Sequence, residues 1–556
     1  MRLAWRSRTA NATGVSRILD GNAVGQPLAL FALTALAVGV AWWWLGAPVA
    51  LPPSPLAPGE KLYCVSYAPF RDGQDPLVEG TMVPPAQIDE DLALLSRYTD
   101  CVRTYSIANG LDKVPEIAQR YGLKVLQGLW LSNQALGNRQ QIATTIALAK
   151  KYPDAIRAVI VGNEVLLRGE MSSPDLAAII HEVKSQIAQP VTYADVWEFW
   201  LRYADLQNAV DFVTIHILPY WEDFPLPASL AAAHIDSIRK RVAAAIPNKE
   251  IVIGEVGWPS HGRMREGALP SPLNQARVTE ETLALGKREN FRVNVIEAFD
   301  QPWKRWLEGS TGRYWGIFDR ATKGPKFTFG GAVSNHPQWA MQALAGIALA
   351  ALIFAGAWLV RRGKDAPPRL WPRIAVLAFV PAVLFGWTIE LMPIESYSVG
   401  GWLRAIALAA VAAAAPIVCA AACAAGRARP TFAYLLGRPG EPRDALGVAL
   451  GIVFIALVLL AVQAGLGLVF DPRYRDFAFA PLTAAVVPFL VLMASTRRPA
   501  GSRAMAETAA AAVLAASAIY IVPNESFANW QAVWFCAAIL GLGLILARAP
   551  DAQSSG

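Results

Sequence analysis

The sequence is poor in the residues that hold metals and disulfide frameworks. It has five cysteines and five histidines among 556 residues. So few cysteines exclude a small scaffold held together by several disulfides. The histidines His181, His234 and His336 are scattered without the spacing of metal ligands. We therefore expect no metal site and no other cofactor.

Charge is also scarce and is unevenly distributed. Charged residues make up 17% of the chain and hydrophobic residues 54%. Residues 60–335 carry charges throughout, whereas residues 336–556 consist mostly of long runs of alanine, leucine, valine and isoleucine. This composition excludes a single ordinary soluble domain. It predicts one soluble domain joined to one membrane domain.

The N-terminus has a basic segment followed by an apolar run from Leu28 to Leu45, which is long enough to span a bilayer. No clear small-residue cleavage site follows the run, and a proline-rich stretch comes next. We interpret the run as an uncleaved signal anchor, with a cleaved signal peptide as the alternative.

The apolar runs of the C-terminal half predict about seven further spans. They lie near 339–360, 373–392, 402–424, 445–469, 478–494, 505–522 and 530–547. Basic residues gather in alternate loops. The three basic loops contain Arg361, Arg362 and Lys364; Arg427, Arg429, Arg438 and Arg443; and Arg497, Arg498 and Arg503. Arg473 and Arg475 lie in a loop that the alternation would leave without basic residues. The positive-inside rule then places both termini in the cytoplasm and residues 47–335 outside.

The expected organisation follows from these boundaries. It comprises a cytoplasmic tail at 1–27, a transmembrane signal anchor at 28–46, a proline-rich linker at 47–60, an outer domain at 61–335, a membrane domain of about seven helices at 336–547 and a cytoplasmic tail at 548–556. The basic loops largely account for the net charge of +7, so nucleic acid is not an expected partner. Cys64 and Cys101 would face an oxidising compartment, where a bridge between them is possible but not required.

The outer domain alternates short apolar runs with patterns compatible with helices. The runs lie at 61–67, 101–106, 123–131, 156–164, 190–197, 211–220, 251–258 and 292–299. They are rich in β-branched residues, as expected of strands that are buried on both faces. Eight such units in this length predict a (β/α)₈ TIM barrel. An open doubly wound sheet is less favoured, because no glycine-rich phosphate loop follows the first run.

Two of these runs end on a carboxylate. Glu164 closes the fourth run and Glu255 lies near the end of the seventh. In a TIM barrel the C-terminal ends of the strands build the active site, so the two side chains should face each other across its mouth. A pair of carboxylates in this arrangement is typical of enzymes that cleave glycosidic bonds. In such a pair one carboxylate donates a proton to the leaving oxygen and the other attacks the sugar, and we expect the two carboxyl groups to lie ~5–5.5 Å apart as in retaining enzymes.

Aromatic residues gather at or just past the expected strand ends, where their flat rings could bind the apolar faces of sugars. The aromatic members of the expected binding site are Tyr67, Trp130, Tyr220, Trp221, Trp258 and Trp303. The last three tryptophans follow successive strands, so we expect them to form one wall of the cleft that holds an acceptor sugar.

At these positions the sequence resembles glycoside hydrolase family 17 over roughly residues 60–320. Asn163 and Glu164 resemble the Asn-Glu that carries the acid on the fourth strand, and residues 254–259 resemble the Gly-Glu-x-Gly-Trp-Pro that carries the nucleophile on the seventh. The resemblance implies that Glu164 is the acid and Glu255 the nucleophile. Arg103 and Tyr105 resemble the motif of the second strand.

Further positions extend this resemblance near the end of the domain. Lys304 and Glu308 precede a Gly-Ile-Phe at 316–318, as the family's Lys and Glu precede Gly-Leu-Phe. By resemblance we expect Asn163, Arg103, Tyr105 and Lys304 to bind substrate. The chain departs from plant members in having Leu218 where they have the first tyrosine of Tyr-Pro-Tyr. We expect His216, on the same strand face, to take over the hydrogen bond to the nucleophile.

With its membrane region, the chain resembles bacterial membrane proteins of this family that take part in making periplasmic β-1,3/β-1,6-glucans. This resemblance implies an enzyme of the bacterial inner membrane, with its catalytic domain in the periplasm. It would act on β-1,3-glucan by transfer, forming β-1,6 or β-1,3 linkages. Besides β-glucan and the lipid bilayer, a glucan synthase or export complex is a candidate partner.

Two alternatives remain open at this point. One is a plain endo- or exo-β-1,3-glucanase. The other is a glucan transport or binding protein with a non-catalytic barrel, for which Glu390 would be the charged residue of interest within a span. We prefer an anchor or docking role for the membrane domain.

Overall fold

The computed structural model describes residues 21–436, 443–495 and 504–548. Several predicted cytoplasmic features lie outside the described residues, namely the tails at 1–20 and 549–556 and the basic residues Arg438, Arg497, Arg498 and Arg503. The chain divides into two compact units, one of residues 48–335 and one formed by residues 1–47 together with 336–556.

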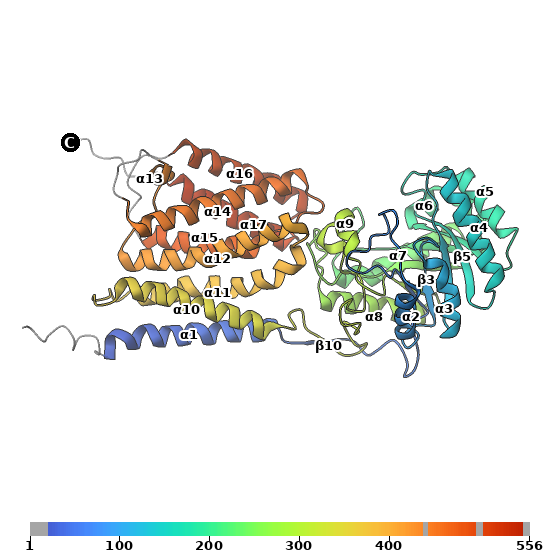
Figure 1. Ribbon diagram of the computed structural model, residues 1–556, viewed down its shortest axis with the longest axis horizontal. Coiled ribbons are helices and arrows are strands. Elements are labelled where there is room, and N and C mark those ends of the chain that lie inside the picture. Colours follow the sequence, from blue (N-terminus) through green and yellow to red (C-terminus); the bar gives the residue numbers. More distant parts are fainter. Residues whose placement is uncertain (1–20, 437–442, 496–503, 549–556) are drawn as a thin grey trace, which may run out of the picture. The chain divides into compact units, whose positions relative to one another are not determined.

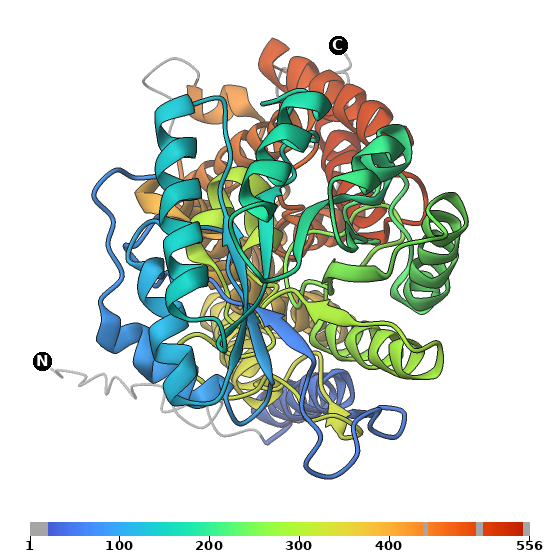
Figure 2. The same cartoon turned by 90° about the vertical axis from the view of Figure 1, so that its right-hand side faces the viewer.

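The first unit is a closed barrel of eight parallel strands, β2 to β9 in sequence order (Figures 1 and 2). The strands are β2 Cys64–Ser66, β3 Cys101–Arg103, β4 Lys124–Leu129, β5 Ile156–Asn163, β6 Val191–Val196, β7 Val213–His216, β8 Ile251–Val256 and β9 Val293–Val295. Each lies within one of the predicted runs. The (β/α)₈ prediction is therefore confirmed.

A helix follows each strand, and Figure 2 shows helices ringed around the strands. The helices are α2 Pro85–Leu95, α3 Val114–Arg120, α4 Ala135–Lys151, α5 Ser173–Lys184, α6 Trp197–Arg202, α7 Ala228–Ala245, α8 Pro272–Arg288 and α9 Arg305–Gly312. Local signals fix several starts. Ser172 and Ser271 each accept a hydrogen bond from the backbone three residues later, and α5 and α8 carry proline in their first turn.

The barrel core consists of strand side chains that are almost all buried. In β8, for example, every residue from Ile251 to Val256 is buried. Several buried polar residues, among them Arg103, Asn163 and Glu255, lie at or near the C-terminal ends of the strands. This is the face at which barrel enzymes build their sites.

Two features of this unit involve pairings distant in sequence. A disulfide joins Cys64 of β2 to Cys101 of the neighbouring β3, across a separation of 37 residues. A separate two-stranded antiparallel ribbon pairs β1 Val49–Ala50 with β10 Ala332–Val333. This ribbon was not predicted.

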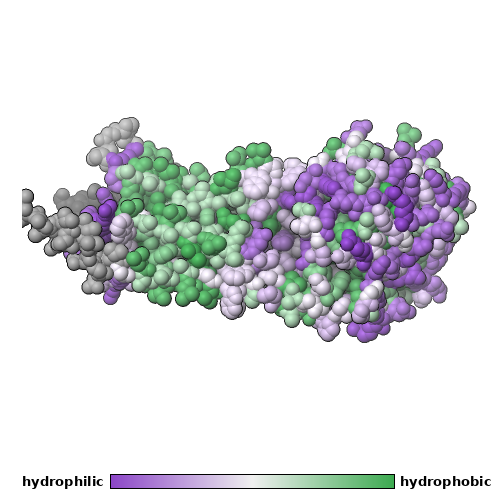
Figure 3. Space-filling view, turned by 60° about the horizontal axis from the view of Figure 1, so that its bottom comes forward, coloured by the Kyte–Doolittle hydropathy of each residue, from purple (hydrophilic) through white to green (hydrophobic). Residues whose placement is uncertain are grey.

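The second unit is helical. Its helices are α1 Gly21–Leu45, α10 Trp339–Arg361, α11 Leu370–Glu395, α12 Ser398–Ala425, α13 Phe432–Leu436, α14 Ala445–Phe470, α15 Phe479–Ser495, α16 Met505–Glu525 and α17 Trp530–Ala547. Seven helices in the described ranges are long and apolar enough to cross a membrane, and α15, with 17 residues, is apolar but shorter. On the face shown in Figure 3 the surface of this unit is largely hydrophobic, whereas hydrophilic residues predominate on the barrel.

Among the described residues of the helical unit, two pairs of charged or titratable side chains are largely buried. Glu390, in the last turns of α11, binds Nδ1 of His336 through both carboxylate oxygens, at 2.9 and 2.8 Å. Arg429 donates to Glu507 at 2.9 Å, and both side chains are almost fully buried. Paired charges of this kind are compatible with a packing role for these residues.

Candidate active site

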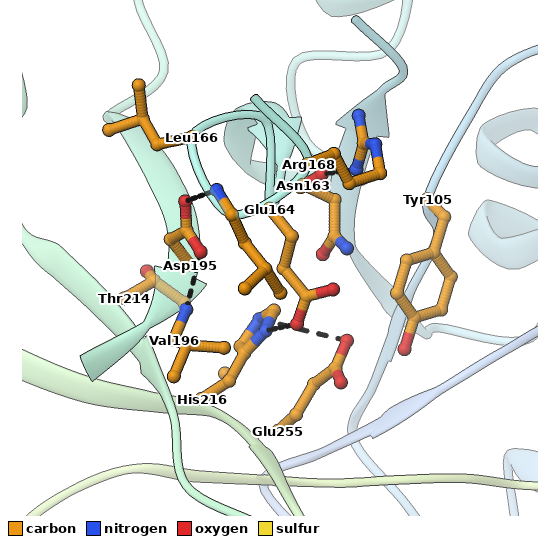
Figure 4. A network of polar contacts seen from close by, with 12 residues as sticks. Tyr105, Asn163, Glu164, Leu166, Arg168, Asp195, Val196, Thr214, His216 and Glu255 are labelled. Atoms are coloured by element: carbon orange, nitrogen blue, oxygen red, sulfur yellow. Dashed lines mark hydrogen bonds and ion pairs between the residues drawn. The ribbon is translucent and has the colours of Figure 1, made fainter. Parts of the chain in front are cut away.

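Glu164 and Glu255 lie together at the C-terminal ends of their strands (Figure 4). Glu164 follows β5 directly, and Glu255 is the penultimate residue of β8. One oxygen of each carboxylate and a nitrogen of His216 all lie within 4.8 Å of one another. The barrel therefore brings together the two carboxylates that the sequence singled out.

A glycine at a shift in strand register lies just before each of the two carboxylates. Gly162 adopts the left-handed conformation, with φ +86°, where the pairing of β5 with β6 shifts register. Glu164 is itself left-handed, with φ +53°, which is uncommon for a residue with a side chain. The pairing of β8 with β9 also shifts register around Gly254. A Cβ on Gly254 would lie 2.4 Å from Thr214 and 3.1 Å from the His216 ring, so glycine leaves room for the histidine beside Glu255.

Arg103, the last residue of β3, is the main partner of Glu255. Its guanidinium donates to Oε1 of Glu255 at 2.7 Å and to the carbonyl of Gly254 at 3.1 Å. The same group donates to Oδ1 of Asn163 at 2.5 Å, and it lies over the Tyr105 ring at 4.4 Å. The arginine side chain is 1% exposed, so its charge acts in a site with little water to screen it.

His216, the last residue of β7, contacts both carboxylates unequally. Its Nδ1 is hydrogen-bonded to Oε1 of Glu164 at 2.8 Å, whereas its Nε2 lies 3.7 Å from Oε1 of Glu255. The prediction that His216 supplies the missing hydrogen bond to the nucleophile is therefore wrong, because the histidine forms its hydrogen bond with Glu164. Tyr105 donates that hydrogen bond instead. Tyr105 lies two residues past the end of β3, and its hydroxyl points toward Glu255 (Figure 4).

The electrostatics of the site hold Glu255 ionised. Burial by itself would raise the pKa of this carboxyl. The positive charges of His216, Arg103 and Lys304 oppose burial and outweigh it. Together with the hydrogen bond from Tyr105 they lower the pKa of Glu255 to about 2. Burial and the nearby Glu255 charge in turn raise the pKa of Tyr105 well above its ordinary value, so the phenol stays protonated as a donor.

A second group of charges surrounds Lys304. Its ammonium lies 3.1 Å from Oε2 of Glu297, and burial raises the pKa of both Glu297 and Glu308 to about 7. Burial opposes the charge of Lys304, but the carboxylates Glu297, Glu308 and Glu255 raise its pKa. Sequence reasoning missed Glu297, although it lies near the end of the eighth apolar run, as Glu255 lies near the end of the seventh.

The three side chains Glu164, His216 and Glu255 offer donor atoms at a spacing that could also hold a metal ion. Arg103 already donates to Glu255 at 2.7 Å, and Lys304 adds a further positive charge. A dication would have to share this space with the guanidinium. The donor set therefore fits carboxylate chemistry better than metal binding.

The predicted aromatic residues divide into two groups. Tyr67, Tyr220 and Trp258 are fully buried, with 0% of each side chain exposed. The polar atom of each ring donates a hydrogen bond inside the protein. The Tyr67 hydroxyl donates to Asp91, the Tyr220 hydroxyl to the Arg263 carbonyl and the Trp258 indole to the Leu269 carbonyl. The expectation that these three rings line the cleft is therefore wrong. Tyr220 packs instead against the rings of Trp258 and Trp315, with 6.1 Å between ring centroids in each pair.

Trp130, Trp221 and Trp303 remain partly exposed. The guanidinium of Arg168 covers one face of Trp130, with 4.1 Å between the guanidinium carbon and the ring centroid. Trp303 is oriented by a hydrogen bond from its indole to Gln301 at 2.9 Å. Trp221 packs edge-to-face on Tyr220, with 4.9 Å between ring centroids. Two of the three tryptophans expected in the acceptor wall thus keep accessible surface.

A (β/α)₈ barrel with two carboxylates facing each other at its C-terminal mouth is typical of glycoside hydrolases. Comparison with known proteins adds a family model that covers somewhat less than half of the chain. Residues 64–316 match the family model of the BtgE/BtgC glycoside hydrolase domain. The chain therefore carries a glycoside hydrolase domain of this type, and the predicted family resemblance and glycosidase activity are confirmed.

Individual relatives agree with this family. The chain is 24% identical over 263 residues to glucan 1,3-beta-glucosidase BGL2 of Candida albicans, covering 43% of this chain and 85% of that protein. It is 27% identical over 268 residues to the probable beta-glucosidase btgE of Aspergillus flavus, covering 46% and 42% of the two chains. A solved structure of a glycoside hydrolase family 17 beta-1,3-glucanosyltransferase from Rhizomucor miehei covers 48% of this chain and 97% of its own, with 23% identity and a TM-score of 0.43.

Proposed function

We propose that the chain is a membrane-anchored enzyme that cleaves β-1,3-glucan with retention and transfers the released glucosyl or glucanosyl unit to another sugar, forming β-1,6 or β-1,3 linkages. The matched domain places it among β-1,3-glucan glucosidases and glucanosyltransferases. The transfer step, the linkage and the membrane setting are the parts that we add.

The observation that carries this proposal is the separation of the two carboxylates. Oxygens of Glu164 and Glu255 lie within 4.8 Å. Retaining enzymes hold their carboxyl groups ~5–5.5 Å apart, whereas inverting enzymes leave ~6.5–9.5 Å for a water molecule. A separation this short supports direct attack by one carboxylate on the sugar.

The surroundings of each carboxylate support separate roles. Glu255 is buried and ionised beside Arg103, so it is the group prepared to attack the anomeric carbon. The Glu164 side chain is 24% exposed, so it can reach the leaving oxygen and donate a proton to it. After the leaving group departs, Glu164 can remove a proton from an incoming water or sugar hydroxyl. Attack by a sugar hydroxyl completes transfer and needs no nucleotide sugar.

The acidic limb of the pH profile should follow from the low pKa of Glu255. Its pKa of about 2 keeps the nucleophile ionised well below the range of an ordinary glutamate. We therefore expect kcat/KM to persist to about pH 3. Tyr105→Phe removes a hydrogen bond to the ionised form, which raises the pKa and should move the limb upward by roughly one pH unit. Intrinsic fluorescence at each pH checks that the fold persists, and an unmoved limb in this variant would contradict the assignment.

The partly exposed Trp221 and Trp303 should act on transfer more than on cleavage. Each follows a strand end, and stacking a sugar on one ring is worth about 1–2 kcal/mol at ~25 cal/mol per Å² of apolar surface. Trp221→Ala or Trp303→Ala should therefore lower the ratio of transfer to hydrolysis by roughly 5- to 30-fold while cleavage continues. The ratio is measured from product chain lengths at fixed donor concentration. The matched Trp→Phe variants keep an aromatic ring, so their ratio of transfer to hydrolysis should stay close to that of the wild type. Unchanged ratios in both alanine variants would show that these residues do not form the acceptor site.

We place the barrel in the periplasm and the helices in the bacterial inner membrane. The long apolar helices support membrane association. The disulfide between Cys64 and Cys101 supports an oxidising compartment for the barrel. On this proposal the partners are β-glucan and the lipid bilayer, with a glucan synthase or export complex as a further partner.

Product analysis of the full-length chain in detergent tests the proposal. Incubated with laminari-oligosaccharides, the enzyme should give products both shorter and longer than the donor, with retained configuration in the first product. Products that are only shorter would favour the plain glucanase. Binding without any product would favour the transport or binding protein.

A further inference from the structure

The turn that carries Glu164 is held from strand β6 by three hydrogen bonds. The backbone N–H of Glu164 donates to the carbonyl of Ala194 at 2.8 Å. The next two bonds go to side chains: the N–H of Leu166 donates to the Tyr193 hydroxyl at 3.0 Å, and the N–H of Leu167 donates to Oδ2 of Asp195 at 3.4 Å. Because residue 164 has positive φ, its side-chain direction depends on this turn staying closed.

Tyr193 and Asp195 form one buried unit. The tyrosine hydroxyl donates to Oδ2 of Asp195, and Oδ1 of the same carboxylate accepts from the N–H of Val196 at 2.7 Å. The exposed fractions are 1% for Tyr193 and 0% for Asp195. Burial, together with the charge of Glu164, raises the pKa of Asp195 to about 6, although the hydrogen bond from Tyr193 opposes the rise. A buried carboxyl this close to the acid is costly unless it contributes to the site.

The opposite side of the turn is held differently. Arg168 donates to the carbonyls of Asn163 and Leu131, and its guanidinium lies over the Trp130 ring. Glu164 thus lies between an arginine clamp from its own turn and the Tyr193–Asp195 pair from β6. The Glu164 carboxyl is in turn hydrogen-bonded to His216, with 2.8 Å between Oε1 and Nδ1.

We propose that Asp195, acting through Tyr193 and the backbone of residues 164–167, is a positioning residue that aims Glu164 at the leaving oxygen. This role rests on the proposed function, in which Glu164 is the acid. Asp195 makes no contact with the reacting bond. Its removal should therefore weaken proton donation and leave nucleophilic attack by Glu255 largely intact.

The choice of leaving group separates these two effects. A sugar leaving group must be protonated as it departs, whereas dinitrophenolate leaves as a stable anion without a proton. We compare kcat/KM, which reports the glycosylation step, for a laminari-oligosaccharide and for the dinitrophenyl β-glycoside of laminaribiose. For Asp195→Asn and Tyr193→Phe we expect kcat/KM on the oligosaccharide to fall about 10- to 100-fold, part of the ~10²–10⁴-fold that a general acid supplies. On the dinitrophenyl substrate we expect a loss of less than about 3-fold.

A matched control lies at the other end of the same strand. Asp211 accepts a hydrogen bond from the N–H of Val191, the first residue of β6, at 2.7 Å. Asp211→Asn should disturb β6 without preferring either substrate. If Asp195→Asn fails to fold, as judged by its melting temperature, Tyr193→Phe provides the same comparison.

Combining variants gives a second test. Asp195→Asn added to Glu164→Ala should cost little more on the oligosaccharide than Glu164→Ala alone, because both changes remove one function. Equal losses on both substrates, or full additivity with Glu164→Ala, would overturn the positioning role. A wild-type chain that turns over neither substrate would instead overturn the proposed function, and this role with it.

Discussion

Replacing Glu255 with alanine should abolish turnover. The variant lacks the carboxylate that forms the glycosyl-enzyme, and loss of one member of a covalent catalytic unit costs roughly 10⁴- to 10⁶-fold in kcat. Its guanidinium partner Arg103, 1% exposed, is left without the anion it binds. The measurement is kcat on laminari-oligosaccharides, with melting temperature recorded for each variant to separate lost chemistry from lost fold.

A small anion should restore part of this activity and change its outcome. Added azide can enter the space left by the Glu255 side chain, beside the charge of Arg103, and attack the sugar directly. The product should then be a glycosyl azide of inverted configuration. Glu250→Ala is the matched control, because Glu250 lies exposed just before the same strand, at its other end, and pairs with Arg292 at 3.1 Å. Normal activity in Glu255→Ala would remove this residue from the mechanism.

Replacing Glu164 with alanine should cost about 10²- to 10⁴-fold on oligosaccharides, the usual contribution of a general acid. The loss in kcat/KM should be much smaller on the dinitrophenyl glycoside, whose leaving group needs no proton. Deglycosylation should also slow, because Glu164 serves as the base in the second step. A glycosyl-enzyme should therefore accumulate, detectable as a burst of dinitrophenolate. Equal losses on the two substrates, with no burst, would contradict the assignment of Glu164 as the acid.

The regular part of the fold could be predicted because burial leaves a direct trace in the sequence. Each barrel strand is buried on both faces, so it reads as a short apolar run, and all eight strands lie inside the predicted runs. The long helices of the second unit read as long apolar runs, and α10 and α17 begin at the predicted residues. The ribbon of β1 and β10 left no such trace. Its strands are only two residues long, and the residues that pair are separated in the sequence by nearly the whole barrel.

The two carboxylates could be predicted because a charged residue at the end of a buried strand is costly and conspicuous. The environment of aromatic rings could not be predicted in the same way. Trp258 and Tyr220 follow strand ends as Trp221 and Trp303 do, yet both are completely buried. Their surroundings include contacts such as the one from the Trp258 indole to the Leu269 carbonyl, which no local pattern encodes.

The partners of the carboxylates were only partly accessible to sequence reasoning. Arg103 and Tyr105 were expected to bind substrate, and the structure places both at Glu255 instead. Asp195 lies inside an apolar run and was passed over, although a carboxylate in a buried strand is itself a signal. Whether Cys64 and Cys101 pair was left open, and the adjacency of β2 and β3 in the closed barrel brings them together.

The central claim is that Glu255 forms a covalent bond to the sugar, and trapping that bond tests it most directly. A 2-deoxy-2-fluoro-β-glycoside with a good leaving group slows both chemical steps, and slows breakdown of the intermediate enough for it to accumulate. The full-length protein is incubated with this reagent, digested and analysed by mass spectrometry. We expect a single fluoroglycosyl label on the peptide that contains Glu255, and none in Glu255→Ala. A label on another carboxylate, or turnover of the reagent with inversion and without any label, would show that Glu255 is not the nucleophile.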